Sequence, residues 1–380
     1  MSVGRREVLM GLAGSALPLL TGTAACASAV SFNAPFSVPA DSTKKASKAK
    51  SLPETSPLRE LDTGSRYRRD DPTKSIVDPD LSDAYESVIA PLRTYAKSVI
   101  KAANRYVASD GHDLNAAAQA AGVMKVWADA DALAVVSTEV SYFCRNTALG
   151  PTAFGLMQVQ GAIDSWTRGA IYGWLDSRSG DTMRFVSGLN GTRSGSNNHR
   201  YWAGVTVQAT GIVGNRSDYF DWGVDCARIG LNQVTADGAL PLELARGQKA
   251  LSYHVFSIGA LVMLCEAAAR NGDLSLYSLN GEAMHRLIDF TLSQIDNPEI
   301  IAGIVGIEQE KLGSGGADFD PFDVAWLEIY ESRFPGRSRW SDRMDKLRPL
   351  AITGLGGNLT LLYADKKQSL AAGAEVKRTT

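Results

Sequence analysis

Residues 81–108 read LSDAYESVIAPLRTYAKSVIKAANRYVA, and this stretch decides the fold class. Asp80 and Ser82 suit the N-terminal cap of a helix here, and Pro91 is expected to bend it. The apolar side chains recur at spacings of three and four, which predicts one buried stripe on an amphipathic helix: Tyr85, Val88, Ile89, Leu92, Tyr95, Val99 and Ile100.

The same helical period continues along the chain, with Gly, Asn, Asp and Pro in the joints. Strand-like alternation is confined to residues 352–362. Helices with short joints predict an all-α domain of antiparallel helical hairpins stacked in a ring or superhelix. The further helices are predicted at 115–133, 135–147, 153–177, 201–213, 217–231, 248–270 and 281–294.

The composition is that of an ordinary globular protein, with 39 basic and 41 acidic side chains among 380 residues. This balance argues against a nucleic-acid partner, which requires a strongly basic face. An anionic ligand must therefore be held by a local cluster of Arg and Lys. A monomer is expected.

The N-terminus predicts export from a bacterial cytoplasm. Arg5 and Arg6 precede a short apolar run at 8–20, and small residues follow, so residues 1–29 are expected to form a signal peptide, of the twin-arginine type. The run is too short for a stable membrane span. We expect a periplasmic or secreted protein cleaved after Ala29, with lipid attachment at Cys26 as the alternative.

The chain then divides by composition. Residues 30–60 are rich in Ser, Pro, Ala and Lys and are expected to be a flexible linker. A catalytic domain is expected at 61–366 and a disordered tail at 367–380. The sequence has no metal-ligand motif, no phosphate-binding Gly loop and no dinucleotide fingerprint, so neither a metal nor a cofactor is expected.

Residues 197–202 read NNHRYW, at the expected start of a helix. Either Asn197 or Asn198 suits the helix cap, but a cap explains only one amide. The second amide beside His199 indicates a site that binds an anionic or polar ligand.

A second cluster lies at 238–256. Arg246, Lys249 and Tyr253 share one helix face if the helix at 248–270 reaches back to Arg246. A fixed cation beside a phenol favours the phenolate, so Tyr253 is a candidate general base and general acid. The alternative is a Tyr whose ring packs in the core.

These motifs resemble the alginate lyase superfamily, most closely the polymannuronate lyases of polysaccharide lyase family five. The resemblance covers about residues 60–365 and rests on four stretches: NNHRYW at 197–202, DGALPLELARGQKALSYH at 237–254, VAWLEIY at 324–330 and GLGGNLTLLY at 354–363. It implies an incomplete α/α toroid with a long open cleft, and β-elimination on an acidic polysaccharide without a metal.

The resemblance also implies roles for individual residues. Asn198 and His199 are expected to neutralise the uronate carboxylate, and Arg246 to orient it and lower the pKa of Tyr253. Tyr253 is expected to take the C5 proton and return it to the glycosidic oxygen. Residues 65–71 correspond to a mobile lid, with Arg66 where a Lys is familiar. Further substrate-binding candidates are Tyr67, Asn197, Tyr201, Trp202, Lys249, His254 and Trp326, with core packing as the alternative for Trp326.

Three alternatives remain open at this point. A glucuronan or mixed exopolysaccharide lyase needs the same catalytic group, because mannuronate and glucuronate differ only at C2. A non-catalytic polyuronate-binding protein needs the same scaffold. A glycoside hydrolase needs two flanking carboxylates, for which Asp237, Glu243 and Glu328 are available.

Overall fold

The computed structural model describes residues 31–47, 55–313 and 319–363. The predicted signal peptide at 1–29, with Cys26, and the predicted tail at 367–380 lie outside the described residues. The described residues are built mainly from helices, as the periodicity predicted.

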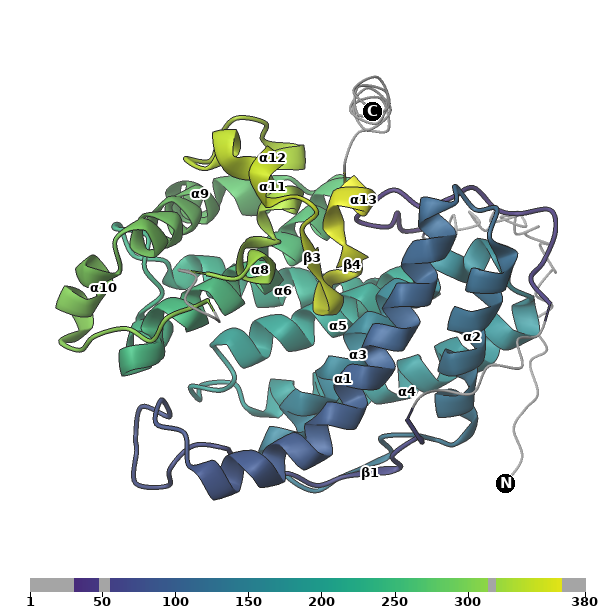
Figure 1. Ribbon diagram of the computed structural model, residues 1–380, viewed down its shortest axis with the longest axis horizontal. Helices are drawn as coiled ribbons and strands as arrows, with labels where there is room; N and C mark the ends of the chain where they lie inside the picture. The colour runs from purple at the N-terminus through teal and green to yellow at the C-terminus, as the bar shows by residue number, and fades with distance from the viewer. Residues whose placement is uncertain (1–30, 48–54, 314–318, 364–380) are drawn as a thin grey trace, which may run out of the picture. The chain divides into compact units, whose positions relative to one another are not determined.

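Four pairs of consecutive helices pack against each other as hairpins (Figure 1). The second helix of each pair follows the first after a short connection. The pairs are α1 (Pro79–Ala108) with α2 (Leu114–Asp129), α3 (Glu139–Val159) with α4 (Ser165–Gly188), α5 (Asn198–Gly214) with α6 (Ser217–Gln233), and α8 (Ala250–Arg270) with α9 (Ser275–Asp296).

The hairpins form two layers. Helices α1, α3, α5 and α8 contact one another in succession, and α11 (Leu327–Arg333) continues this inner layer beside α8. Helices α2, α4, α6 and α9 contact one another in the same order and form the outer layer. The short helix α13 (Leu359–Tyr363) contacts both α1 and α11, which are the two ends of the inner layer. The predicted arrangement of helical hairpins is therefore confirmed.

Short elements connect and extend the hairpins. Strands β1 (Glu60–Leu61) and β2 (Val135–Val136) pair in parallel, and β3 (Ala351–Ile352) and β4 (Gly357–Asn358) pair antiparallel, so only part of the predicted alternation at 352–362 is strand. The remaining elements are α7 (Pro241–Leu244), α10 (Pro298–Val305), α12 (Met344–Leu347) and the 3₁₀ turns η1 (Gln160–Ala162), η2 (Gly247–Lys249), η3 (Pro321–Val324), η4 (Ser341–Arg343) and η5 (Thr353–Leu355).

The boundary between the third and fourth predicted helices was wrong. The pair Gly150-Pro151 indicated a joint, but both residues lie inside α3 and are buried. A Cβ added at Gly150 would lie 3.3 Å from the Thr206 hydroxyl of α5. Glycine is thus used for close approach of two inner helices and not for a turn.

The prediction of a flexible linker at 30–60 was also wrong for residues 31–47, which we call the strap. Phe36 is buried in the core at 3% exposure, and Phe32 stacks on Phe220 with ring centroids 4.3 Å apart. The backbone N–H of Ser37 donates to the carbonyl of Leu362. The contacts of Phe32 and Phe36 therefore hold this segment on the domain, although its composition is polar.

Helix α8 lies at the centre of the domain, in contact with α5, α6, α9 and α11. The stretch Gly247–Arg270 is long and apolar enough to cross a membrane, but 83% of its most apolar window is buried inside the protein. This is the pattern of a central core helix, which explains its hydropathy.

Candidate active site

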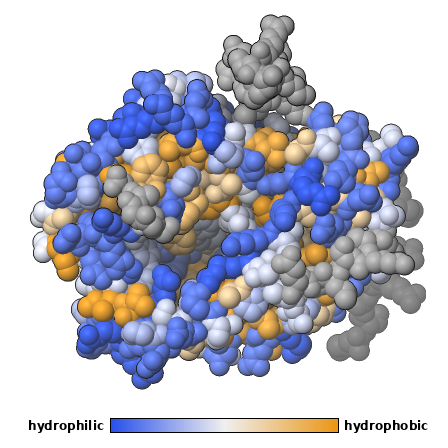
Figure 2. Space-filling view, viewed as in Figure 1, coloured by the Kyte–Doolittle hydropathy of each residue, from blue (hydrophilic) through white to orange (hydrophobic). Residues whose placement is uncertain are grey.

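The candidate site forms where three segments meet: the start of α5, the junction between α7 and α8, and a hairpin that precedes α1. The face of the domain in Figure 2 is hollowed near its middle, with hydrophilic and hydrophobic atoms around the hollow. The hairpin is the loop before α1 at the lower edge of Figure 1.

Residues 66–78 form this hairpin, which we call the lid hairpin. Tyr67 and Val77 pair as an antiparallel bridge, and the N–H of Asp78 donates to the carbonyl of Arg66. The buried carboxylate of Asp71 accepts hydrogen bonds from three backbone N–H groups and one hydroxyl of the tip, those of Thr73, Ser75 and Ile76. One acidic side chain therefore holds the tip in a single shape.

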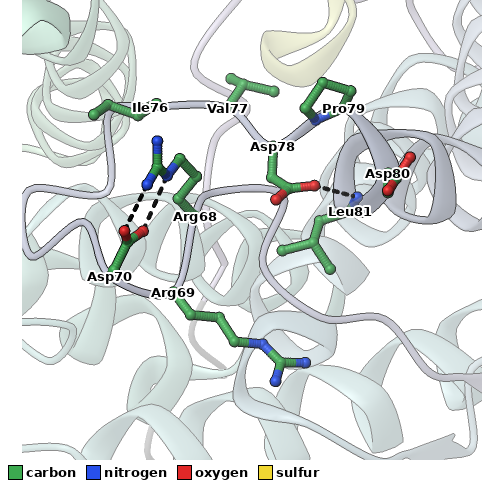
Figure 3. A pocket seen from close by; sticks show the side chains of 9 residues that line it. All are labelled: Arg68, Arg69, Asp70, Ile76, Val77, Asp78, Pro79, Asp80 and Leu81. Atoms are coloured by element: carbon green, nitrogen blue, oxygen red, sulfur yellow. Dashed lines mark hydrogen bonds and ion pairs between the residues drawn. The ribbon is translucent and has the colours of Figure 1, made fainter.

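A hollow of about 710 Å³ lies at the base of the lid hairpin (Figure 3). Arg68 is paired with Asp70, and Asp78 caps the first turn of α1 by accepting from the Leu81 N–H. Asp80 adds a third carboxylate, against two guanidinium groups. This hollow is therefore less suited to a polyanion than the site beneath the hairpin.

The lid hairpin brings Tyr67 to Tyr253 on α8. Their hydroxyl oxygens lie 2.8 Å apart, and Arg66 donates to the Tyr67 hydroxyl at 3.3 Å. At this distance a proton can move between the Tyr67 and Tyr253 oxygens along the hydrogen bond. The sequence placed Arg66, Tyr67 and Tyr253 in one site, and the structure brings them together.

Arg246 also contacts Tyr253, but the two residues do not lie on one helix as predicted. Helix α8 begins at Ala250, so Arg246 precedes the helix and the turn η2 separates them. Gly247 has a φ of 56°, which permits this turn. The guanidinium carbon of Arg246 lies 3.6 Å from the centre of the Tyr253 ring, and the same side chain donates to the Lys74 carbonyl of the lid hairpin.

The electrostatics of the two tyrosines differ from the sequence-based expectation. Burial raises the pKa of Tyr253 well above its ordinary value, Tyr67 adds to this, and Arg246 offsets only part of it. Burial acts on Tyr67 in the same sense, but Arg66, the Tyr253 hydroxyl and Arg246 together lower the pKa of Tyr67. The cationic side chains therefore favour ionisation of the pair at Tyr67, whereas the sequence pointed to Tyr253.

His199 lies in the first turn of α5, half-buried, with its ring stacked on Phe143 at 3.9 Å between centroids. Burial lowers the pKa of His199 to about 3, with Arg246 and Arg193 acting in the same direction. The imidazole is therefore neutral at physiological pH, and it is suited to hydrogen bonding more than to charge neutralisation.

The two asparagines have different positions. Asn197 is the cap of α5 and is buried, and its side-chain oxygen accepts from the His199 N–H at 3.1 Å, so that oxygen serves the helix start. Asn198 is fully buried, and its backbone N–H and side-chain NH₂ both donate to Glu243. Its side-chain oxygen has no hydrogen-bond partner among the described residues.

Trp202 is the predicted aromatic side chain that stays partly exposed. Its ring stacks on Phe256 at 4.9 Å, and its indole N–H donates to the Phe256 carbonyl. Phe256 is 45% exposed and lies edge-on to Tyr253 at 6.3 Å between centroids. Phe256 was missed as a site residue, although its spacing of three from Tyr253 on a helix indicates the same face.

Four side chains that were predicted to bind substrate make hydrogen bonds or ion pairs within the protein. His254 is fully buried: Nε2 accepts from the Leu240 N–H, and Nδ1 lies 2.8 Å from the Ala250 carbonyl. Tyr201 and Trp326 are each 1% exposed and donate to backbone carbonyls. Lys249 is paired with Glu310. The predictions that His254, Tyr201 and Trp326 bind sugar are therefore corrected, and Trp326 packs in the core. Lys249 is partly exposed, so its role in binding stays a prediction.

Two of the three carboxylates considered for hydrolysis are bound within the protein. Glu243 is bound to Asn198, and Glu328 is buried and paired with Arg348. Asp237 is exposed. Within the described part of the chain, no group of three or more His, Cys, Asp or Glu side chains is arranged to hold a metal ion.

Comparison with known proteins connects this site to a family. The family model described as alginate lyase matches residues 39–301. An alginate lyase of Pseudomonas syringae pv. syringae is 30% identical over 308 residues, which cover 79% of each chain. A polysaccharide lyase of Stenotrophomonas maltophilia is 28% identical over 296 residues, 77% of this chain and 85% of that protein.

The solved structures agree with the sequence relatives. Alginate lyase A1-III from Sphingomonas species A1 superposes with a TM-score of 0.68 at 25% identity, over 83% of this chain and 86% of that one. A variant of A1-III complexed with a tetrasaccharide gives a TM-score of 0.70 over 86% and 89%. The helical domain thus has the α/α barrel fold of A1-III. With a family match over more than half of its length, the chain belongs to the alginate lyase family, whose members are polysaccharide lyases.

Proposed function

We propose that this protein cleaves β-1,4-linked mannuronate in alginate by syn β-elimination and leaves a 4,5-unsaturated uronate at the new end. The family match and the names of the relatives support alginate as the polymer. The observation that carries the mechanism is the 2.8 Å contact between the hydroxyls of Tyr67 and Tyr253 beside Arg246.

The difficult step is removal of the C5 proton. The carbanion must place its charge on a carboxylate that is already negative, so donors aimed at that carboxylate stabilise the transition state. Arg246 has a buried Nε without a protein partner among the described residues, and neutral His199 lies close enough for the two to interact electrostatically. These two side chains are proposed to bind the carboxylate.

The tyrosine pair supplies the base. Loss of one proton from the pair leaves a negative charge that Arg66 and Arg246 stabilise, and the pair titrates as a unit. The Tyr253 hydroxyl passes its own proton to the Tyr67 phenolate, and the Tyr253 oxygen takes the C5 proton as the C4=C5 bond forms and the C4–O4 bond breaks. Tyr253 then returns a proton to O4, and Tyr67 gives back the proton that it received, so the pair keeps its single negative charge. One side chain serves both steps only when the C5 hydrogen and O4 lie on the same side, as in mannuronate and glucuronate.

No metal is assigned a part in this scheme. The scheme also does not discriminate mannuronate from glucuronate, which differ at C2, away from the reacting atoms. Guluronate has an axial O4 and requires a base and an acid on opposite faces, so we expect the slowest turnover there.

The test is ultraviolet absorbance of the unsaturated product, with the chain from Val30 incubated with polymannuronate, polyguluronate or glucuronan in the presence of a chelator. A rise on polymannuronate is expected. A rise on glucuronan alone would keep the mechanism and change the substrate. Binding of polymannuronate without any rise would contradict the lyase assignment and favour a binding protein.

We further propose that the protein acts in the periplasm or outside the cell. The support is the Arg5-Arg6 pair, the apolar run and the small residues near Ala29. Mass spectrometry of the N-terminus after expression in a bacterium with twin-arginine export would distinguish cleavage after Ala29 from lipid attachment at Cys26.

A further inference from the structure

Phe256 is a large apolar side chain beside Tyr253 that the proposed elimination does not use. A single exposed apolar side chain on the outside of a protein is ordinary. Phe256 instead lies on the central helix α8, where every other residue from Ala250 to Ala268 is buried or partly buried and Phe256 is 45% exposed. Solvent therefore reaches the central helix at Phe256, one helical turn from Tyr253.

The neighbouring inner helix α5 presents an aromatic side chain to the same space. From Arg200 to Ile212 every residue of α5 is buried except Trp202, which is partly exposed. The rings of Trp202 and Phe256 stack, with centroids 4.9 Å apart and an angle of 25° between their planes. Two inner helices thus combine their accessible side chains in these stretches into one aromatic surface, which we call the aromatic platform.

The aromatic platform is fixed by backbone contacts. The indole N–H of Trp202 donates to the carbonyl of Phe256 at 3.1 Å. A Cβ added at Gly354 in η5 would lie 3.2 Å from Cζ3 of the indole, and one added at Gly259 in α8 would lie 3.7 Å from Cζ2. The absence of side chains there lets η5 and α8 pack against the indole. A surface that is already ordered loses little side-chain entropy when a ligand binds to it.

The position of the platform relative to Tyr253 suits a polymer. Phe256 lies edge-on to Tyr253, with 6.3 Å between the ring centroids and an angle of 86° between the planes. This is close to the distance between adjoining sugar rings in a 1,4-linked chain. A chain whose reacting sugar lies at the Tyr253 hydroxyl can therefore place an adjoining sugar over the platform. Aromatic rings bury large apolar areas, so they bind the face of a sugar ring that carries hydrogen atoms.

We propose that Phe256 is a specificity-determining residue, whose ring together with Trp202 binds the apolar face of the sugar next to the one that loses its C5 proton. This inference rests on the proposed function and deepens it. β-Mannuronate carries only hydrogen atoms at the axial positions of one face. α-Guluronate carries axial oxygens on both faces, so neither face packs as closely on the platform. The platform therefore favours mannuronate in the adjoining position, independently of the stereochemistry of elimination.

The test separates the adjoining sugar from the reacting one. Polymannuronate places mannuronate on both sides of each reacting sugar, whereas a strictly alternating polymer of mannuronate and guluronate places guluronate there. The values of kcat and KM on both polymers, and thermal midpoints, are measured for the wild type, Phe256→Ala and Phe256→Leu. Trp166→Ala is the matched control, because Trp166 is an aromatic side chain with 62% exposure on the outer helix α4.

Phe256→Ala should raise KM on polymannuronate about 10-fold with little change in kcat, because the lost contact is equal in the bound and transition states. The rise on the alternating polymer should be smaller, so the preference for polymannuronate narrows. Phe256→Leu keeps apolar volume without a flat ring and should change KM in the same direction. The control should match the wild type. An unchanged KM, an equal rise on both polymers or a loss confined to kcat would overturn the proposal.

Titration calorimetry in the Tyr253→Phe background makes the test independent of turnover. There, Phe256→Ala should weaken binding of polymannuronate about 10-fold. A wild type that binds but yields no unsaturated product contradicts the lyase assignment, and this titration still decides whether Phe256 binds the polymer. A wild type that neither cleaves nor binds contradicts both proposals. If Phe256→Ala does not fold, Phe256→Leu carries the test, and failure of both to fold would show that the ring is structural.

Discussion

The hydroxyl oxygens of Tyr67 and Tyr253 lie 2.8 Å apart, although 186 residues separate them along the chain. Tyr67 comes from the lid hairpin and Tyr253 from the central helix α8, so the pair exists only while the hairpin rests on α8 and the turn before it. The contacts of Arg246 with Lys74 and of Gln248 with Ser75 hold the hairpin there.

Tyr253→Phe should lower kcat by about 100- to 10,000-fold, the usual contribution of a positioned acid–base group. The ring stays beneath Arg246, so binding of polymannuronate should persist. Product absorbance measures the first effect and titration calorimetry the second. Retained turnover would show that another group removes the C5 proton.

Tyr67→Phe should shift the alkaline dependence of kcat/KM to higher pH. In the native pair the first proton is lost at Tyr67, whose pKa is lowered, despite burial, by Arg66, the Tyr253 hydroxyl and Arg246. Without Tyr67 the base must form at Tyr253 alone, and burial raises the pKa of Tyr253. A pH profile of both proteins checks this, and a shift to lower pH would contradict the coupling.

His254→Leu should destabilise the protein by about 1–3 kcal/mol, because the N–H of Leu240 loses its buried acceptor. Burial lowers the pKa of His254 to about 4, below the unfolded value near 6.5. The contribution of neutral His254 is therefore complete above pH 6.5 and is lost as the pH falls towards 4. Urea unfolding across this range should show a shallower acid loss in the variant, and equal slopes would contradict it.

Phe36→Ala should cost about 3–5 kcal/mol, as expected for a large aromatic removed from a core. Leu274, which is 57% exposed, offers a matched control, and Leu274→Ala should change stability by less than about 0.5 kcal/mol. Chemical denaturation measures both. If Phe36→Ala were as mild as the control, the strap would not be part of the cooperative unit.

The sequence predicted what depends on local period and on short motifs. The helices follow from apolar spacing, and a helix start near NNHRYW at 197–202 was predicted, with the cap left open between Asn197 and Asn198. The proximity of Arg246 to Tyr253 was also predicted, although a turn and not a helix provides it. In each case the relevant neighbours lie within a few residues along the chain.

What the sequence did not predict depends on distant partners. Nothing local to Glu243 indicates that it satisfies the start of α5, 45 residues earlier. Buried His254 accepts a hydrogen bond from the backbone N–H of Leu240, 14 residues earlier. The pKa of Tyr253 is raised by burial and by the distant Tyr67. The strap was misread because its composition is polar while two phenylalanines determine its position.

The bond between Ser37 and Leu362 has a consequence for biogenesis. The strap leaves the ribosome before any described helix of the domain, yet its binding partner lies in α13, the last of the described helices. Phe36 contacts Phe154 and Tyr363, so its pocket is incomplete until α13 is in place. The strap is synthesised before the helices of the domain, but we expect it to dock only after α13 has packed.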